Sequence, residues 1–153
     1  MSEDDLKEVY FINKQSFTSD AWLLEAFKRE FELPYSYKFV LESRGSIIGY
    51  IILWIIDKEA TIMTFAIKKE YRGKGLGKLL LKKVMERIKT VADRIVLDVR
   101  KSNIKAIRLY KSLGFRIVKE RKRFYSDGED AFMMIKELRD GLYKWEETEA
   151  VSY

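Results

Sequence analysis

The spacing of apolar residues predicts two helices at the start of the chain, over residues 4–16 and 20–32. Apolar side chains recur there three or four positions apart, which is the spacing that gathers them on one face of an α-helix. Asp20 stands where the second pattern begins, and aspartate is a preferred N-cap residue. We therefore expect Asp20 to cap the second helix.

β-Branched and alternating runs predict three strands next, over residues 37–42, 47–56 and 59–67, with a turn at residues 44–46. A helix from about Leu76 to Lys89, a strand over 94–99 and a helix over 103–113 follow. Gly114 is expected at the C′ position that ends the last helix. A hairpin of residues 116–125 and 130–138 around residues 126–129 completes the pattern. This order predicts one α/β domain with a mixed sheet over residues 1–138, and residues 139–153 as a C-terminal tail.

Three glycines alternate along the stretch "YRGKGLGK", residues 71–78, between a predicted strand and an amphipathic helix. The first amides of a helix have no backbone acceptor and lie at the positive end of its dipole, so this junction predicts an anion site. Arg72, Lys74 and Lys78 add positive charge. The spacing fits neither a Walker A loop nor a dinucleotide fingerprint, and Leu79 stands where Walker A needs a hydroxyl.

The amino-acid composition limits the catalytic groups and metal ligands that this chain can use. The chain has no cysteine and no histidine, which excludes disulfides, thiolate zinc sites, cysteine nucleophiles and the usual general base, and we predict no metal. The net charge of +6 modestly favours a polyanionic partner, although many surface lysines explain it equally well. The acidic start and the short apolar run at 51–56 predict neither a signal peptide nor a membrane segment, hence a cytoplasmic protein.

The arrangement Arg72-x-x-Gly75-x-Gly77 resembles the pyrophosphate motif of the GCN5-related N-acetyltransferase (GNAT) superfamily, which binds acetyl-coenzyme A (acetyl-CoA). Residues 97–115, "LDVRKSNIKAIRLYKSLGF", are similar to its second signature. The hairpin "FYSDGEDAFMM", residues 124–134, is similar to that of RimI-type N-terminal acetyltransferases. The resemblance implies a central mixed, mostly antiparallel sheet flanked by about four helices. The first strand that is usual in this family is expected to be missing or very short here, because a helix pattern begins at Asp4.

The resemblance implies a donor site on one strand, the glycine loop and the next helix. The pantetheine arm would lie along Phe65, Ala66 and Ile67, while the pyrophosphate would bind amides of the glycine loop. Asn103 matches a cofactor-binding position, and it also suits the N-cap of the helix that follows it. The implied cofactor-binding residues are Phe65, Ala66, Ile67, Arg72, Gly73, Lys74, Gly75, Leu76, Gly77, Lys78, Asn103 and Tyr110.

For catalysis, Tyr110 matches the general acid of the family, with packing on the sheet as its alternative role. Asp98 stands where RimI-type enzymes carry a glutamate base, and could instead be a structural carboxylate paired with Arg100 or another cation. Glu59 is a second candidate base. The Ile67 amide is expected to polarise the thioester carbonyl. Because the chain has no cysteine and no histidine, an acetyl-cysteine intermediate is excluded, and direct transfer in a ternary complex is the expected mechanism.

The acceptor is expected to be the N-terminal α-amine of a protein, with a ribosomal protein as one candidate. It would contact Phe17, Trp22, Phe124 and Tyr125. About a tenth of such amines is neutral at pH 7, against far less of a lysine. A small amine, a lysine, and a non-catalytic acetyl-CoA-binding or docking module remain alternatives. We interpret the basic run at residues 116–123 as a solvated hairpin face rather than a nucleic-acid site, and monomer and homodimer both stay open.

Overall fold

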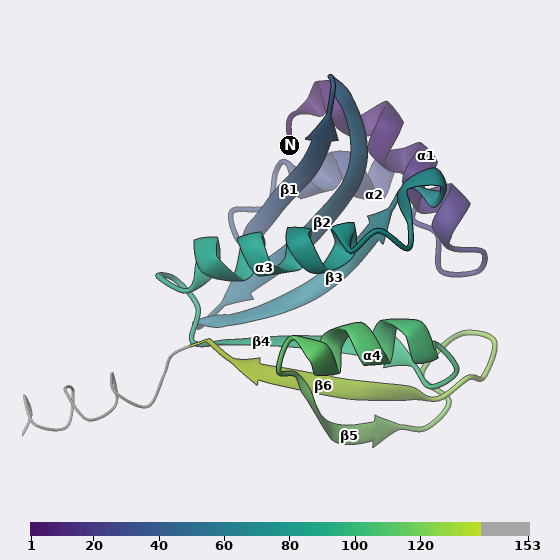
Figure 1. Ribbon diagram of the computed structural model, residues 1–153, viewed down its shortest axis with the longest axis vertical. Coiled ribbons are helices and arrows are strands. Elements are labelled where there is room, and N and C mark those ends of the chain that lie inside the picture. The colour runs from purple at the N-terminus through teal and green to yellow at the C-terminus, as the bar shows by residue number, and fades with distance from the viewer. Residues whose placement is uncertain (139–153) are drawn as a thin grey trace, which may run out of the picture.

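The structure of the protein is a computed structural model, and it describes residues 1–138. Its strands form one six-stranded sheet in the order β1-β2-β3-β4-β6-β5 (Figure 1). All neighbouring strands are antiparallel except β3 and β4, so the predicted mixed, mostly antiparallel sheet is confirmed. The strands are β1 Ser36–Ser43, β2 Ser46–Ile56, β3 Glu59–Ile67, β4 Arg94–Arg100, β5 Arg116–Arg121 and β6 Ala131–Glu137.

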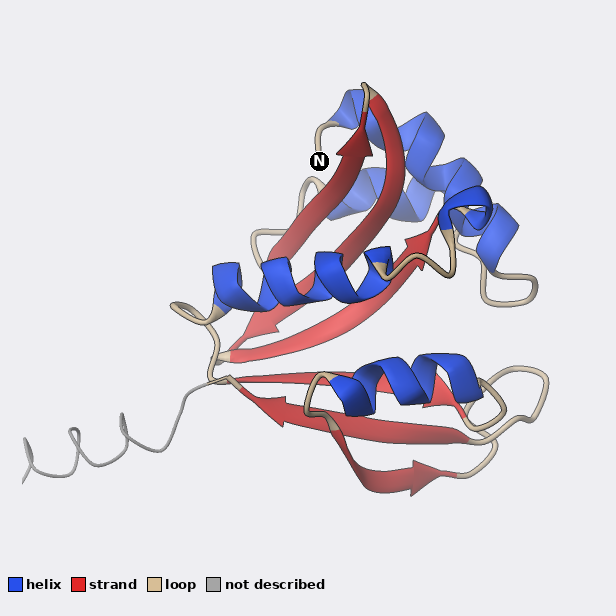
Figure 2. Cartoon of the chain, in the orientation of Figure 1, coloured by secondary structure: helices blue, strands red, loops and turns tan. Residues whose placement is uncertain are grey.

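Helices cover both faces of this sheet (Figure 2). Two short 3₁₀ turns, η1 Glu3–Asp5 and η2 Lys69–Tyr71, accompany the α-helices, and no strand precedes η1. One core cluster joins the sheet to α3 and α4, and a second joins it to α1 and α2. Strand β2 contributes Ile51 to the first cluster and Tyr50 to the second, which explains its continuous apolar run. The α-helices are α1 Leu6–Ser16, α2 Leu24–Glu30, α3 Leu76–Ile88 and α4 Ile104–Ser112.

The parallel pair β3–β4 is short, and this creates an opening in the sheet. Only residues 59–61 of β3 pair with residues 94–96 of β4. Beyond them the strands diverge, with α3 over β3 and α4 beside β4 (Figure 1). An irregularity in the β2–β3 register, between Ile52 and Leu53, adds Met63 to β3 at the start of the divergent part. Such bulges bend a strand, which is consistent with β3 leaving β4 here.

Two predicted boundaries were wrong. The second helix begins at Leu24, after the N-cap Leu23, rather than at residue 20. Asp20 caps nothing, because its carboxylate binds Arg100. The first hairpin strand ends at Arg121 instead of residue 125, because the chain turns at Arg123, which has a φ of +52° and donates its amide to Asp130.

The termini of α4 are confirmed. The Asn103 side chain accepts a hydrogen bond from the Ala106 amide at 3.2 Å, so it is the N-cap. At the other end Gly114 has a φ of +93°, and Phe115 donates its amide to the Tyr110 carbonyl. This six-to-one bond belongs to the Schellman motif, which favours glycine. The predicted tail, residues 139–153, lies outside the described residues.

Candidate active site

The divergence of β3 and β4 opens a cleft of about 700 Å³. Its wall comes from the loop after α1, the end of β3, the glycine loop, β4 and α4, and it reaches Tyr125 of the last hairpin. Segments up to about a hundred positions apart in the sequence therefore meet in one groove. The predicted site residues in this wall are Phe17, Trp22, Phe65, Ala66, Ile67, Arg72, Gly73, Gly75, Leu76, Gly77, Lys78, Asp98, Asn103, Tyr110 and Tyr125.

The glycine loop presents its backbone to the cleft. Gly73 and Gly75 both have a φ of +76°, which disfavours any residue with a side chain, and no atom lies within 4 Å of a built Cβ at either position. Gly75 is the N-cap of α3 and gives no side-chain cap. Within residues 1–138, the amides of residues 73–78 have no hydrogen-bond acceptor. The loop is thus a run of open donors at a positive helix end.

The charged side chains of this loop have different roles. Lys78 lies in the cleft wall. Arg72 donates from Nε to the Ile67 carbonyl at 2.9 Å and from a terminal nitrogen to Ser16 Oγ at 2.7 Å, so it ties the loop to β3 and α1. Lys74 lies outside the cleft wall, with its ammonium 5.4 Å from the centre of the Tyr71 ring. The backbone amides, more than the Arg72 and Lys74 side chains, make this an anion site.

The free edge of β3 adds further donors. The Lys68 amide donates to the Ile48 carbonyl of β2 at 2.8 Å. Because successive residues of an antiparallel strand alternate between its two edges, the amides of Phe65 and Ile67 face away from β2. The bond from Arg72 to the Ile67 carbonyl lies on this same edge. The end of β3 therefore offers main-chain groups to anything extended along the cleft.

Tyr110 reaches the cleft from α4. Its side chain is buried, and its ring meets the Phe115 ring edge-on at 5.6 Å between centroids. Among the described residues its hydroxyl has no hydrogen-bond partner, although it lines the cleft. Burial raises the pKa of the Tyr110 phenol, and the nearby Tyr125 adds to this. The phenol therefore stays protonated at neutral pH, as a proton donor requires.

Asp98 enters the same cleft from β4. Its Oδ1 accepts a hydrogen bond from Arg121 Nε at 2.9 Å, and its second oxygen has no partner among residues 1–138. The alternative role predicted a pairing with Arg100 or another cation. Arg100 binds other carboxylates, so the partner is the other cation, Arg121. Glu59 is paired with Arg94 at 2.7 Å at the start of β3 and is absent from the cleft wall. Of the two candidate bases, only Asp98 lies beside Tyr110 in the cleft.

Aromatic side chains form a further part of the cleft wall. Phe17 and Trp22 come from the loop between α1 and α2, and Tyr125 comes from the loop of residues 122–130. Burial is the main cause that raises the pKa of Tyr125 to about 12. Phe124 is 47% exposed and lies outside the wall, where its ring packs edge-on against Tyr125. The structure thus brings three of the four predicted acceptor residues together.

A buried polar network holds the loop that carries Trp22. Asn13, which is fully buried in α1, accepts the Trp22 amide on Oδ1 at 2.7 Å. Its Nδ2 donates to the Tyr50 hydroxyl at 2.8 Å and to Thr64 Oγ1 at 3.3 Å. The network links this loop to strand β3, and burial raises the pKa of Tyr50 to about 12. We did not predict a role for Asn13; its one signal is a polar side chain within the apolar stripe of α1.

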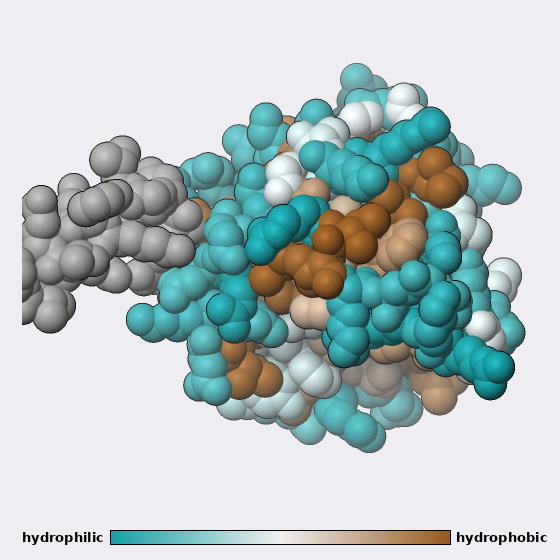
Figure 3. Space-filling model, turned by 90° about the horizontal axis from the view of Figure 1, so that it is seen from below, coloured by the Kyte–Doolittle hydropathy of each residue, from teal (hydrophilic) through white to brown (hydrophobic). Residues whose placement is uncertain are grey.

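The basic run of residues 116–123 is partly neutralised. Arg121 binds Asp98, and Lys122 binds Glu120 and Asp130. Figure 3 views the molecule from the side on which β5 lies and shows apolar side chains among hydrophilic ones. Strand β5 itself exposes Ile117 and Val118. This face therefore mixes exposed apolar side chains with charged side chains that are partly paired.

Within residues 1–138 no helix combines the length and apolar character needed to cross a membrane. In the same range no three acidic side chains converge in a way that would hold a metal ion.

Comparison with known proteins gives the family. The model of the acetyltransferase (GNAT) family matches residues 5–115. The chain belongs to this family. A putative ribosomal protein bS18-alanine N-acetyltransferase of Bacillus subtilis is 42% identical over 88% of this chain and 90% of its own length. An N-alpha-acetyltransferase of Sulfurisphaera tokodaii is 37% identical over 72% of each chain.

The solved structures agree with the GNAT fold. The ribosomal-protein-S18-alanine N-acetyltransferase of Escherichia coli superposes with a TM-score of 0.82 and 29% identity, covering 92% of each chain. The matched range of the family model contains the glycine loop, Asp98 and Tyr110, whereas Tyr125 lies beyond it. The resemblance to the GNAT superfamily and to its RimI-type members is therefore confirmed.

Proposed function

We propose that this GNAT enzyme transfers the acetyl group of acetyl-CoA to the N-terminal α-amine of a protein. The observation that carries the proposal is that the glycine loop with its open amides, Tyr110 and Asp98 all line one cleft. Relatives that match most of the chain are named N-alpha-acetyltransferases, and those from Bacillus subtilis and Escherichia coli are named for a ribosomal protein. A ribosomal protein is therefore our first candidate acceptor, and the cytoplasm the proposed location.

The cleft fits acetyl-CoA by its chemistry. The coenzyme has an anionic pyrophosphate, which suits the open amides of residues 73–78. It also has an amide-containing pantetheine arm, which can pair like an added strand with the free edge of β3 at Phe65 and Ile67. Asn103 and Lys78 lie in the same wall. We assign the cofactor to this side of the cleft, with Arg72 as a brace rather than a phosphate ligand.

The reaction needs three actions from the chain. When bound, acetyl-CoA supplies the acetyl thioester. The Ile67 amide polarises its carbonyl, and Asp98 takes up the proton that the attacking amine loses, through a bridging water because aspartate is one methylene shorter than glutamate. As the carbon–nitrogen bond forms and the carbon–sulfur bond breaks, Tyr110 protonates the departing sulfur. Asp98 then releases its proton to the solvent, and the solvent returns a proton to the Tyr110 phenolate.

We expect the exchange of Gly75 for alanine to weaken acetyl-CoA binding by about tenfold. A side chain at a positive φ costs about 1–2 kcal/mol, and adopting another φ would turn amides away from the site. Calorimetry with acetyl-CoA measures this. The control is Gly45→Ala, in the β1–β2 turn, since its φ is +81° and nothing lies near it. Equal binding by wild type and Gly75→Ala would argue against the loop as the pyrophosphate site.

The acceptor proposal is tested with a peptide panel and an assay for free thiol. We expect turnover with peptides that have a free N-terminus, because an α-amine is far more often neutral at pH 7 than a lysine amine. Matched peptides with a blocked N-terminus and free lysines should give no turnover. Turnover of the blocked peptides, or of small amines alone, would favour the alternatives. Binding of acetyl-CoA with no turnover of any acceptor would favour a non-catalytic module.

A further inference from the structure

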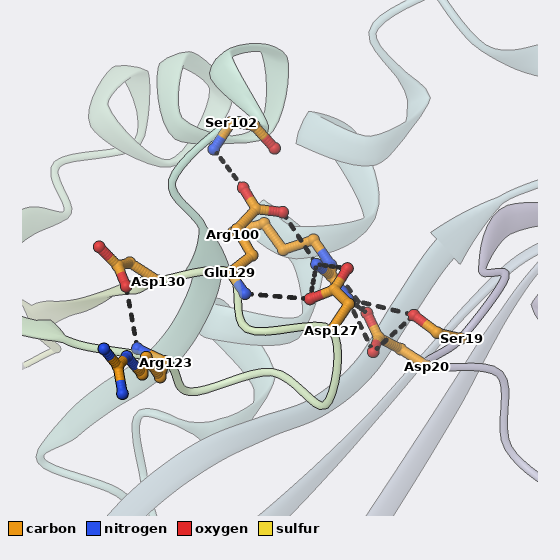
Figure 4. Close-up of polar contacts among 8 residues, drawn as sticks. All are labelled: Ser19, Asp20, Arg100, Ser102, Arg123, Asp127, Glu129 and Asp130. Atoms are coloured by element: carbon orange, nitrogen blue, oxygen red, sulfur yellow. Dashed lines mark hydrogen bonds and ion pairs between the residues drawn. The ribbon is translucent and has the colours of Figure 1, made fainter.

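Arg100, at the end of β4, is the centre of an unusually dense ionic cluster (Figure 4). Its guanidinium binds Asp20 at 2.8 Å, Asp127 at 2.9 Å and Glu129 at 2.8 Å. The Nε and both terminal nitrogens all donate in these contacts. Only the planar fork of arginine, with five donors, can satisfy three carboxylates in this way.

The partners of Arg100 come from two loops that are far apart in the sequence. Asp20 belongs to the loop of residues 17–23, whereas Asp127 and Glu129 belong to the loop of residues 122–130. Arg100 also stacks on the Tyr125 ring, with 4.1 Å between its guanidinium carbon and the ring centre. Over residues 1–138, no direct hydrogen bond or ion pair joins these two loops. Arg100 is the link between them.

Both loops wall the acceptor end of the cleft. The loop of residues 17–23 contributes Trp22, and the loop of residues 122–130 contributes Tyr125. The glycine loop takes no part in the ionic cluster. Arg100 and Asp20 themselves line the cleft, whereas the glycine loop is held by Arg72 and by the start of α3.

We propose that Arg100 is a positioning residue that clamps the loops of residues 17–23 and 122–130 into one acceptor-binding wall. The clamp sets the distance between Trp22 and Tyr125 without touching the reacting atoms. It deepens the proposed function and rests on it for the kinetic consequences. The coupling of the two loops through Arg100 does not depend on the identity of the acceptor.

The kinetic test is the Arg100→Lys variant, which keeps the positive charge and loses the planar guanidinium with its several donors. We expect the KM for an acceptor peptide to rise about tenfold, the scale of one or two lost charge-assisted hydrogen bonds. The KM for acetyl-CoA should stay within about twofold. The matched control is Arg94→Lys, whose ion pair with Glu59 lies outside the cleft wall. An equal rise in both KM values, or no change in either, would overturn the clamp.

A second test needs no activity. Backbone hydrogen exchange is followed by mass spectrometry in wild type, Asp20→Ala and Asp127→Ala. We expect Asp20→Ala to speed exchange in residues 122–130, and Asp127→Ala to speed it in residues 17–23, because each loop is held through Arg100. Glu59→Ala is the control and should change neither loop. Faster exchange confined to the substituted loop would overturn the proposal, whereas a failed peptide panel would leave this result standing.

Discussion

Replacing Tyr110 with phenylalanine should lower kcat by about 10²–10⁴-fold, the usual contribution of a positioned acid. The substitution removes one oxygen from a ring whose packing against Phe115 stays intact. Because the hydroxyl has no partner among the described residues, its loss breaks no structural hydrogen bond. The dissociation constant of acetyl-CoA and the melting temperature should therefore change little. Steady-state kinetics and calorimetry on the same preparation measure both.

The pH profile gives a second measure of Tyr110. Burial raises its phenol pKa, so the protonated donor persists as pH rises past the ordinary tyrosine value of about 10. Activity should rise as the acceptor α-amine deprotonates near pH 8 and then hold, with no alkaline loss from Tyr110 up to about pH 10. A fall in activity already at pH 9, absent in Tyr110→Phe, would contradict this. A parallel loss of activity and cofactor binding in Tyr110→Phe would make the residue structural.

Replacing Asp98 with asparagine should lower kcat by about 10²-fold or more, because the amide cannot accept the amine proton. The loss should be largest below pH 8, where most of the acceptor is protonated, and smaller at higher pH. Asp98→Glu should retain more activity than Asp98→Asn, since it restores the side chain that RimI-type relatives carry. Steady-state kinetics of the three proteins with one peptide gives the comparison.

Asp98 also binds Arg121, so a lost ion pair must be separated from a lost base. Arg121→Gln is the matched control, because it removes the guanidinium and leaves the carboxylate in the cleft. We expect Arg121→Gln to retain most of its turnover. A loss as large as that of Asp98→Asn would mean that the pair, rather than the base, is what the reaction needs. Full activity of Asp98→Asn would remove the carboxylate from the mechanism.

Several structural features of this protein can be predicted from short stretches of its sequence. Strand β3, the core of α3 and both ends of α4 occur where their patterns predict them. Each depends on interactions within a few residues: apolar periodicity, the Asn103 cap, and a positive φ at Gly114. The glycine loop belongs with them, since its open amides follow from alternate glycines at a helix start. These features can therefore be predicted without knowing the order of the strands in the sheet.

Other features depend on segments that meet only in the folded chain. The partner of Asp98 is Arg121, 23 positions away, and Arg100 binds Asp20 across 80 positions. Sequence reasoning took Asp20 for a helix cap and Glu59 for a possible base, because both roles suit an isolated carboxylate. The sheet order and the packing of the loops give both residues other partners. Asp20 joins the Arg100 cluster, and Glu59 pairs with Arg94 outside the cleft. An ion pair forms between groups that the fold brings within reach, so its members can be identified only once the strand order is known. Helix caps and glycine turns depend instead on residues that are neighbours in the sequence.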